Sequence, residues 1–208
     1  MENLWLLLAG LIAYLLGSIP TAFLIVRKAK GKAVWLEGSG NVGTMNVYRA
    51  TGSLWLMALT LIIDMGKAAL ALYIASLLCG SVLGQVMAAV FAVLGHNYSV
   101  FIGFRGGRGL ACLLGIMLYL NWIIAFLCFG IVVASIFTTE YLMRRRIKGV
   151  KKVFGEQILG RVIGMAVCVV VIPFLVKEGV YAALLLASAL SFVEHIQRLK
   201  DYLKNNHP

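Results

Sequence analysis

Charged residues are scarce in this chain of 208 residues. Only 13% of its residues are charged, with 8 Asp and Glu against 19 Lys and Arg, whereas 62% are hydrophobic and the mean hydropathy is +0.94. Ordinary soluble domains are about half apolar and about a quarter charged. The composition therefore disfavours a disordered tail, a disulfide scaffold and a nucleic-acid-binding domain, so we expect no nucleic acid partner. It predicts an integral membrane protein.

The chain also lacks the patterns of a metal or redox site. Its four cysteines have no CxxC spacing and no neighbouring histidine, and they lie in apolar surroundings: Cys79, Cys112, Cys128 and Cys168. Such cysteines are usually small buried apolar residues. We expect no metal and no cofactor, and we assign these thiols no chemistry.

Long uncharged stretches run through the chain, at residues 4–26, 68–104 and 109–139. Each reaches or exceeds the roughly 20 residues that a helix needs to cross a membrane. Polar or glycine-containing breaks divide the chain further, at residues 79–81, 121–122 and 177–179. We expect an all-α, polytopic membrane protein with seven transmembrane helices, forming one membrane domain over residues 1–208.

The basic residues predict the orientation of these helices. They cluster after the first apolar stretch, at 105 and 108, from 144 to 152, and in the C-terminal tail. With seven spans and the N-terminus outside, all these clusters and the C-terminus lie in the cytoplasm, as the positive-inside rule favours. Six spans would place the 144–152 run on the opposite side from the first two clusters. We expect a protein of the plasma or inner membrane whose basic run contacts anionic lipids.

A glycine-rich polar segment, residues 37–49, follows the first basic cluster. Its glycines permit positive φ and leave amide groups uncovered, while short polar side chains and an arginine fork suit a phosphate. A simple turn is the alternative for such a composition. The candidate phosphate ligands are Ser39, Gly40, Asn41, Thr44 and Arg49.

A second segment, residues 95–109, makes the phosphate interpretation stronger. Gly106, Gly107 and Gly109 surround Arg108 just before an apolar helix, so amides, a helix N-terminus and a guanidinium converge on one anion. Neither the spacing nor the ending is that of a nucleotide P-loop. His96 precedes this loop on the charged face, where a role in the site is favoured over that of a core histidine.

Asp64 and Lys67 lie three residues apart within an apolar helix. Unpaired charges are costly in a membrane, so we expect an ion pair. A purely structural pair and one that supports the phosphate site electrostatically are both open.

The first glycine-rich segment, the Asp64/Lys67 pair and the second segment follow one another along the chain between about Tyr14 and Gly115. In this order and spacing they resemble the PlsY family of membrane acyl-phosphate:glycerol-3-phosphate acyltransferases. The resemblance implies seven spans and transfer of an acyl chain from acyl phosphate to the 1-position of sn-glycerol 3-phosphate. The products are lysophosphatidic acid and inorganic phosphate. The chain departs from the family's pattern at several places: Met45 stands where the family has threonine, Ser99 where it has proline and Arg108 where it has lysine. The serine-rich segment after the fifth span is not recognisable, and the closing His-x-x-Asn is reduced to residues 194–198, with His195 but without the Asn.

On this resemblance we expect catalytic roles for His96, Asn46 and Arg108, with the two glycine loops each holding one phosphate. Acyl phosphate is already activated and no GxSxG motif is present, so no covalent acyl-enzyme is expected. The partners are the two substrates and membrane lipids, and we expect a monomer. A transporter or binding protein for an anionic metabolite, or an inactive acyltransferase-like lipid-phosphate binder, remain as alternatives.

Overall fold

The computed structural model describes residues 2–146, 158–175 and 180–205, and these residues form helices joined by short loops. The helices are α1 (Glu2–Ser18), α2 (Thr21–Lys30), α3 (Thr44–Thr51), α4 (Leu54–Cys79), α5 (Val82–Asn97), α6 (Leu110–Leu120), α7 (Trp122–Arg146), α9 (Ile158–Leu175) and α10 (Val180–Asn205), with 3-10 turns η1 (Val34–Leu36) and η2 (Val100–Ile102). Within these residues the only β-type pairing is one isolated bridge between Ser99 and Arg105. The predicted all-α class is confirmed.

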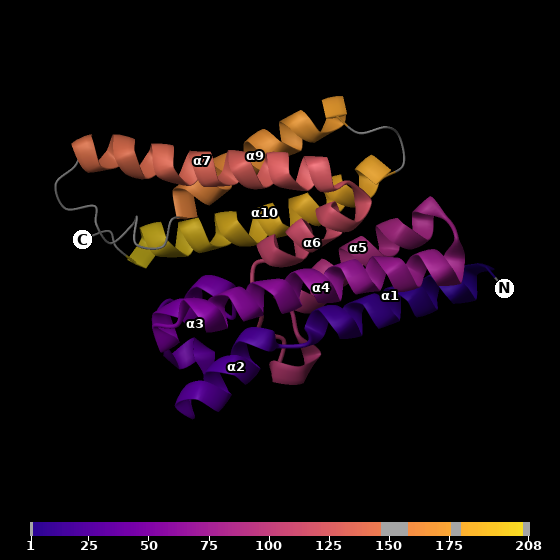
Figure 1. Cartoon of the computed structure of the whole chain (residues 1–208), viewed down its shortest axis with the longest axis horizontal. Coiled ribbons are helices and arrows are strands. Elements are labelled where there is room, and N and C mark those ends of the chain that lie inside the picture. Colours follow the sequence, from indigo (N-terminus) through magenta and orange to yellow (C-terminus); the bar gives the residue numbers. More distant parts are fainter. Residues whose placement is uncertain (1, 147–157, 176–179, 206–208) are drawn as a thin grey trace.

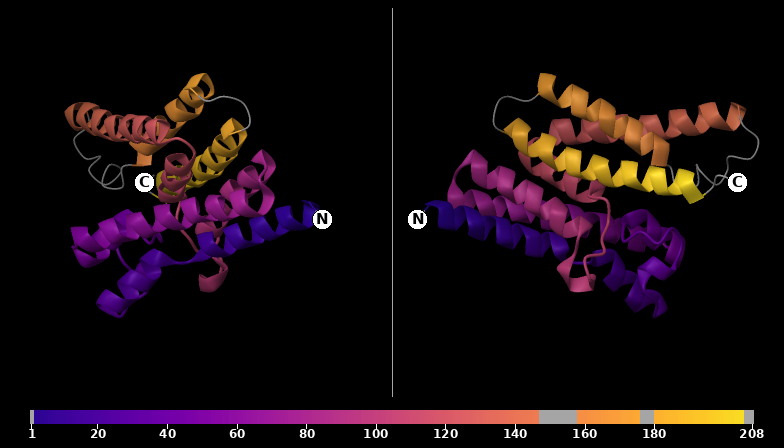
Figure 2. Two further views of the ribbon diagram at one scale, coloured as in Figure 1. Left: turned by 45° about the vertical axis from the view of Figure 1, so that its right-hand side comes forward. Right: turned by 180° about the vertical axis from the view of Figure 1, so that it is seen from behind.

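Two groups of long helices run along the same axis of the molecule (Figure 1). One group contains α1, α4 and α5, and the other contains α7, α9 and α10, with α6 packed against both α4 and α7. In the two further views α2, α3 and the C-terminal end of α10 lie toward one end of the bundle, and the N-terminus lies at the other (Figure 2).

Three described helical stretches are long and apolar enough to cross a membrane: Glu2–Lys30, Leu54–Cys79 and Trp122–Leu142. Four shorter apolar helices accompany them: Val82–Asn97, Leu110–Leu120, Leu159–Ile172 and Ala183–Gln197. These helices fit the composition of a membrane protein. The number of crossings and the orientation of the termini stay predictions.

Two expected breaks between helices are confirmed. Gly80 ends α4 with φ +59°, and the Ser81 hydroxyl then caps α5 by accepting from the Gly84 amide at 3.2 Å. Asn121 separates α6 from α7, and its side-chain oxygen accepts from the amide of Ile123 at 3.1 Å. The third expected turn, at residues 177–179, lies outside the described residues.

The first apolar stretch is not one continuous helix. The helix is interrupted at residues 19–20, because α1 ends at Ser18 and α2 begins at Thr21, although Glu2–Lys30 as a whole is long and apolar enough to cross a membrane. Pro20 causes the break, since it has no amide hydrogen and its ring conflicts with a preceding helical turn. At this break the Ile19 carbonyl accepts from the Thr21 amide at 3.0 Å and from the Lys67 ammonium at 2.8 Å.

Small residues bring the helices of the first group into backbone contact. A Cβ atom on Gly17 of α1 would overlap the Ala92 carbonyl of α5, and one on Gly95 would overlap the Tyr14 carbonyl. Close approach through glycine and alanine is the usual way in which membrane helices pack. It fixes α5, which carries His96, against α1.

The cysteines form no disulfide, and Cys112, Cys128 and Cys168 are buried while Cys79 is half-buried. The expectation of small buried side chains holds for three of the four.

Candidate active site

The first glycine-rich loop, residues 37–43, is built around the side chain of Asn46, which is 1% exposed. The amide nitrogen of this side chain donates to the carbonyls of Val34 at 2.9 Å and Glu37 at 3.0 Å. Its oxygen accepts from the amide of Ser39 at 2.8 Å. Asn46 therefore holds the loop from the inside, and its amide group is already occupied by these contacts.

The second loop, residues 103–109, lies directly against the His96 ring. The Gly107 amide donates to the His96 carbonyl at 3.0 Å. A Cβ atom on Gly107 would overlap His96 Nε2 and would lie 2.9 Å from the Val42 carbonyl oxygen. Only glycine allows the loop to approach both the imidazole and the first loop this closely.

Helices from both groups anchor this second loop. The Ser99 amide donates to the Arg105 carbonyl of the loop at 3.2 Å, and the Ser99 hydroxyl donates to the Ser18 carbonyl at the end of α1 at 2.5 Å. The Ser191 hydroxyl of α10 donates to the Arg108 carbonyl at 2.5 Å. The backbone on which the Arg108 side chain sits is therefore tied to α10.

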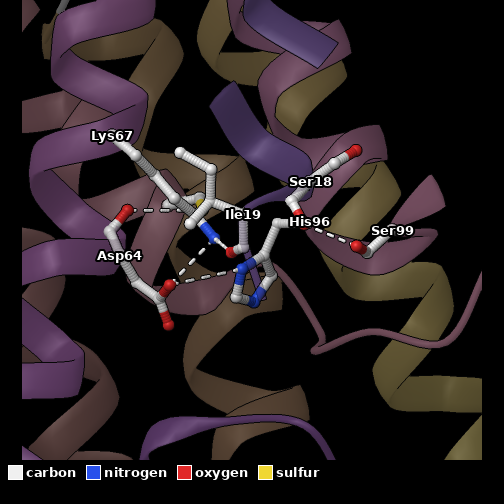
Figure 3. Close-up of polar contacts among 7 residues, drawn as sticks. Ser18, Ile19, Asp64, Lys67, His96 and Ser99 are labelled. Carbon is white, nitrogen blue, oxygen red and sulfur yellow. Dashed lines mark hydrogen bonds and ion pairs between the residues drawn. The ribbon is translucent and has the colours of Figure 1, made fainter. Parts of the chain in front are cut away.

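A buried charged cluster lies behind the loops (Figure 3). Lys67 Nζ is 2.9 Å from Asp64 Oδ1, and His96 Nδ1 is 3.8 Å from the same oxygen. The side chains of Asp64, Lys67 and His96 are 2%, 5% and 7% exposed. The ion pair expected from the three-residue spacing is present, and Lys67 also donates to the Ile19 carbonyl. The cluster thus links the middle of α4 to the C-terminal ends of α1 and α5, and the pairing offsets the cost of burying these charges.

A polar cleft of about 370 Å³ opens between the two loops. Its lining comes from the first loop, the second loop, Trp35 and α10: Trp35, Ser39, Gly40, Asn41, Val42, Asn97, Arg105, Gly106, Gly107, Arg108, Glu194 and Gln197. Arg105 stacks over Trp35 with its guanidinium carbon 4.8 Å from the ring centroid. The uncovered amides and the arginines suit an anionic ligand.

An apolar cavity of about 290 Å³ adjoins this cleft. Its apolar walls come from α3, α4, α6, α7 and α9: Met45, Met57, Leu61, Leu110, Ala111, Leu113, Leu114, Met117, Cys128, Phe129, Val132, Val133, Ile136, Met165 and Cys168. Its polar lining is Asn41, Gly43, Thr44, Asp64, His96, Arg108, Arg161, Ser188 and His195. Asn41 and Arg108 line both spaces, so the polar cleft and the apolar cavity meet at these two residues.

Comparison with known proteins gives the family. The family described as "Glycerol-3-phosphate acyltransferase" matches residues 7–205 of the chain. The chain belongs to this family. The resemblance drawn from the two glycine motifs and the Asp64/Lys67 pair is thereby confirmed.

Members of the family from several bacteria are similar to the chain. A glycerol-3-phosphate acyltransferase of Clostridioides difficile is 31% identical over 210 residues, covering 98% of this chain and 94% of that protein. One from Carboxydothermus hydrogenoformans is 43% identical over 113 residues, covering 54% of this chain and 57% of its own length. One from a Synechococcus strain is 44% identical over 125 residues and is matched over 62% of its length.

The fold also matches solved structures of the family. The crystal structure of PlsY (YgiH), an integral membrane glycerol 3-phosphate acyltransferase, in its glycerol 3-phosphate form superposes with a TM-score of 0.75 at 26% identity. The match covers 98% of this chain and 94% of that protein. A lysophosphatidic acid form of the same protein gives a TM-score of 0.73. The helices of this chain are therefore those of an integral membrane protein.

The predicted site residues divide between the two spaces of the structure. Ser39, Gly40, Asn41, Gly106, Gly107 and Arg108 line the polar cleft, while Thr44, Asp64 and His96 line the apolar cavity. In the described residues Asn46, Arg49 and Gly109 line neither space. Arg49 lies beside the first loop, since a Cβ atom on Gly38 would be 3.0 Å from its Cβ. Lys67 contacts the site through Asp64.

Sequence reasoning missed the residues that the second group of helices contributes. Arg161 of α9 and Ser188 and His195 of α10 line the apolar cavity, and Glu194 and Gln197 line the polar cleft. Ser188 and His195 lie seven residues apart on one face of an apolar helix, with Ser191 between them. Polar side chains on one face of a membrane helix are a signal of function, and that spacing could have identified them.

Proposed function

We propose that this protein transfers an acyl group from acyl phosphate to the 1-hydroxyl of sn-glycerol 3-phosphate. The observation that carries the proposal is the meeting of a polar, arginine-containing cleft and an apolar cavity at Asn41 and Arg108. Glycerol 3-phosphate is small and anionic and suits the cleft, and an acyl chain suits the cavity. The reacting carbonyl then lies where the two spaces meet.

The two glycine loops supply the electrostatic part of catalysis. In this proposal Ser39, Gly40 and Asn41 hold the acceptor phosphate, and Arg108 with the amides of Gly106 and Gly107 stabilises the charge that develops on the leaving phosphate. Amides and guanidinium groups that are already fixed by the fold are effective, because they need no reorganisation during the reaction. The Ser191 bond to the Arg108 carbonyl provides such fixation.

Acyl transfer then needs no covalent enzyme intermediate. The acceptor hydroxyl oxygen attacks the carbonyl carbon, the bond from that carbon to the phosphate oxygen breaks, and its electron pair leaves with the phosphate. The proton of the hydroxyl passes to His96 or to the leaving phosphate. His96 suits this role because it lines the apolar cavity and its Nδ1 faces Asp64, whose carboxylate stabilises an imidazolium. Asn46 acts indirectly, because its side chain holds the first loop in place. Arg49 lies beside the same loop.

The donor and the product are tested with purified protein in detergent. We expect acyl transfer to glycerol 3-phosphate from palmitoyl phosphate, and none from palmitoyl-CoA or from palmitoyl-acyl carrier protein. NMR of the product should show the acyl group on the 1-position. Transfer from palmitoyl-CoA alone would contradict the proposed donor. Anion flux in proteoliposomes without acyl transfer would instead support a transporter, and phosphate binding without either would support an inactive binder.

We also propose seven crossings, with the N-terminus outside and the active face and C-terminus in the cytoplasm. All four native cysteines are first replaced, and single cysteines are introduced at Lys30, Lys148 and Glu178. In intact cells an impermeant maleimide should label position 178 and leave positions 30 and 148 unlabelled until the cells are opened. Labelling of position 148 from outside would exclude the seven-span arrangement.

A further inference from the structure

One helix wall of the apolar cavity carries a cation that no motif of the sequence accounts for. Arg161, Met165 and Cys168 of α9 all line this cavity. Residues at positions i, i+4 and i+7 lie on one face of a helix, so one face of α9 presents a guanidinium above two apolar side chains. This face is therefore amphiphilic along its length.

Close packing of the neighbouring face fixes the rotation of α9. A Cβ atom on Gly160 would lie 2.5 Å from the Ile136 Cα and 2.6 Å from the Thr139 hydroxyl of α7, and one on Gly164 would lie 2.7 Å from the Val132 Cα. Two glycines four residues apart allow membrane helices to pack backbone to backbone. Because this face cannot turn away from α7, the face with Arg161 stays toward the cavity.

The wall formed by α6 has the same arrangement of a guanidinium followed by apolar side chains. Arg108 lies just before α6, and α6 then contributes Leu110, Leu114 and Met117 to the cavity. Gly160 and Gly164 of α9 meet Ile136 and Val132 of α7 in reverse order, and α6 leads into α7 through the turn at Asn121, so α6 and α9 both run opposite to α7. The two guanidinium groups are thus at one end of the cavity, and the apolar side chains of both walls follow below them.

We propose that Arg161 binds the phosphate of the acyl donor, so that this phosphate is held between Arg108 and Arg161. The inference rests on the proposed function, because it assigns a residue to the donor side of that reaction. A cavity with two arginines at one end and apolar walls beyond fits a single-chain amphiphile with an anionic head. The bound phosphate has two possible sources with the same chemistry, the donor acyl phosphate and the product lysophosphatidic acid.

The test compares Arg161→Ala and Arg161→Lys with the parent in detergent. We expect Arg161→Ala to raise the KM for palmitoyl phosphate about 10- to 100-fold and to leave the KM for glycerol 3-phosphate within about 2-fold. Arg161→Lys should recover part of the loss, since it keeps the charge and loses the fork. Arg27→Ala is the matched control, because Arg27 lies over the Phe23 ring, 5.5 Å from its centroid, and lines neither described cavity.

A binding measurement separates this inference from the reaction itself. Palmitoyl phosphonate, which cannot transfer its acyl group, should bind Arg161→Ala about 10- to 100-fold more weakly than the parent by calorimetry. Equal phosphonate affinities, or a rise in the KM for glycerol 3-phosphate alone, would overturn the assignment. Weaker inhibition by lysophosphatidic acid with an unchanged donor KM would assign Arg161 to the product and would also overturn it. Use of palmitoyl-CoA as the sole donor would refute the proposed function, whereas the phosphonate affinities would still report on Arg161.

Discussion

The two groups of helices contribute to the site in different ways. The first group, with α1, α4, α5 and the loops attached to them, supplies both glycine loops and the buried cluster of Asp64, Lys67 and His96. The second group, with α7, α9 and α10, supplies most of one apolar wall and only a few polar side chains. In the proposed function, the motif-rich loops recognise the anion and mostly apolar helix faces recognise the acyl chain. The contrast explains why the glycine motifs pointed to the polar cleft, whereas the apolar cavity left only the spaced polar side chains of α10 as a signal.

Replacement of Arg108 is expected to have the largest effect on activity, because this residue lines both the polar cleft and the apolar cavity. Arg108→Ala removes a charge-assisted contact worth roughly 2 to 4 kcal/mol in the transition state, a loss of about 30- to 1,000-fold in kcat/KM. Steady-state kinetics on purified, folded protein measure it, with Arg27→Ala as the control. Arg49→Ala is compared with it: the sequence predicts a phosphate contact for Arg49 as for Arg108, but in the described residues Arg49 lines neither the cleft nor the cavity. Full activity of the Arg108→Ala protein would refute the proposed arrangement of phosphates.

Close helix packing gives the second expectation, which concerns stability. A Cβ atom on Gly115 of α6 would overlap the Met65 carbonyl of α4 and lie 2.7 Å from the Met65 Cα. Gly115→Ala should therefore lower the free energy of unfolding by about 1 to 3 kcal/mol, as overpacking does. Gly130 of α7 is the matched control, because a Cβ atom there meets nothing within 4 Å. Thermal unfolding in detergent measures both, and equal melting temperatures would show that α4 and α6 are not in backbone contact.

The third expectation tests the apolar cavity as the binding site for the acyl chain of the donor. Met117 lies on α6 seven residues beyond Leu110, the first residue of this helix, which is roughly 10 Å along a helix at 1.5 Å per residue. Met117→Trp should fill the far part of the cavity and shift the ratio of kcat/KM for short over long acyl phosphates by about 10-fold, or roughly 1.4 kcal/mol. Leu77→Trp, at a position 68% exposed on α4, is the control. An unchanged preference across chain lengths would place the acyl chain elsewhere.

Local features of the fold were predictable from the sequence, and features that depend on distant contacts were not. The breaks at Gly80 and Asn121 follow from turn chemistry in a few neighbouring residues. Pro20 was equally local, but it lies inside an apolar stretch whose hydropathy masked the break. The role of Asn46 is different, because only the folded loop shows that its side chain binds Val34 and Glu37. The cavity and Arg161 were not predictable, since helix pairing decides which faces meet.

The smallest expected effect concerns a hydrogen bond that links the two halves. The Tyr98 hydroxyl, after α5, donates to the Glu194 carboxylate of α10, and the bond raises the pKa of this phenol above its usual value. Tyr98 is 43% exposed, so Tyr98→Phe should cost only about 0.5 to 1.5 kcal/mol of unfolding free energy. Tyr48→Phe, at a residue 40% exposed on α3, is the control.

The pH dependence of this difference identifies its source. A group whose pKa is raised by folding contributes stability that is present below its unfolded pKa, about 10 for tyrosine, and is lost as the pH rises through the folded value. The difference in unfolding free energy between the parent and Tyr98→Phe should therefore be constant from neutral pH to about pH 9 and shrink above pH 10. Chemical unfolding in detergent at several pH values measures it. A difference that persisted undiminished at high pH would show that it does not come from the bond that the protonated Tyr98 hydroxyl donates to Glu194.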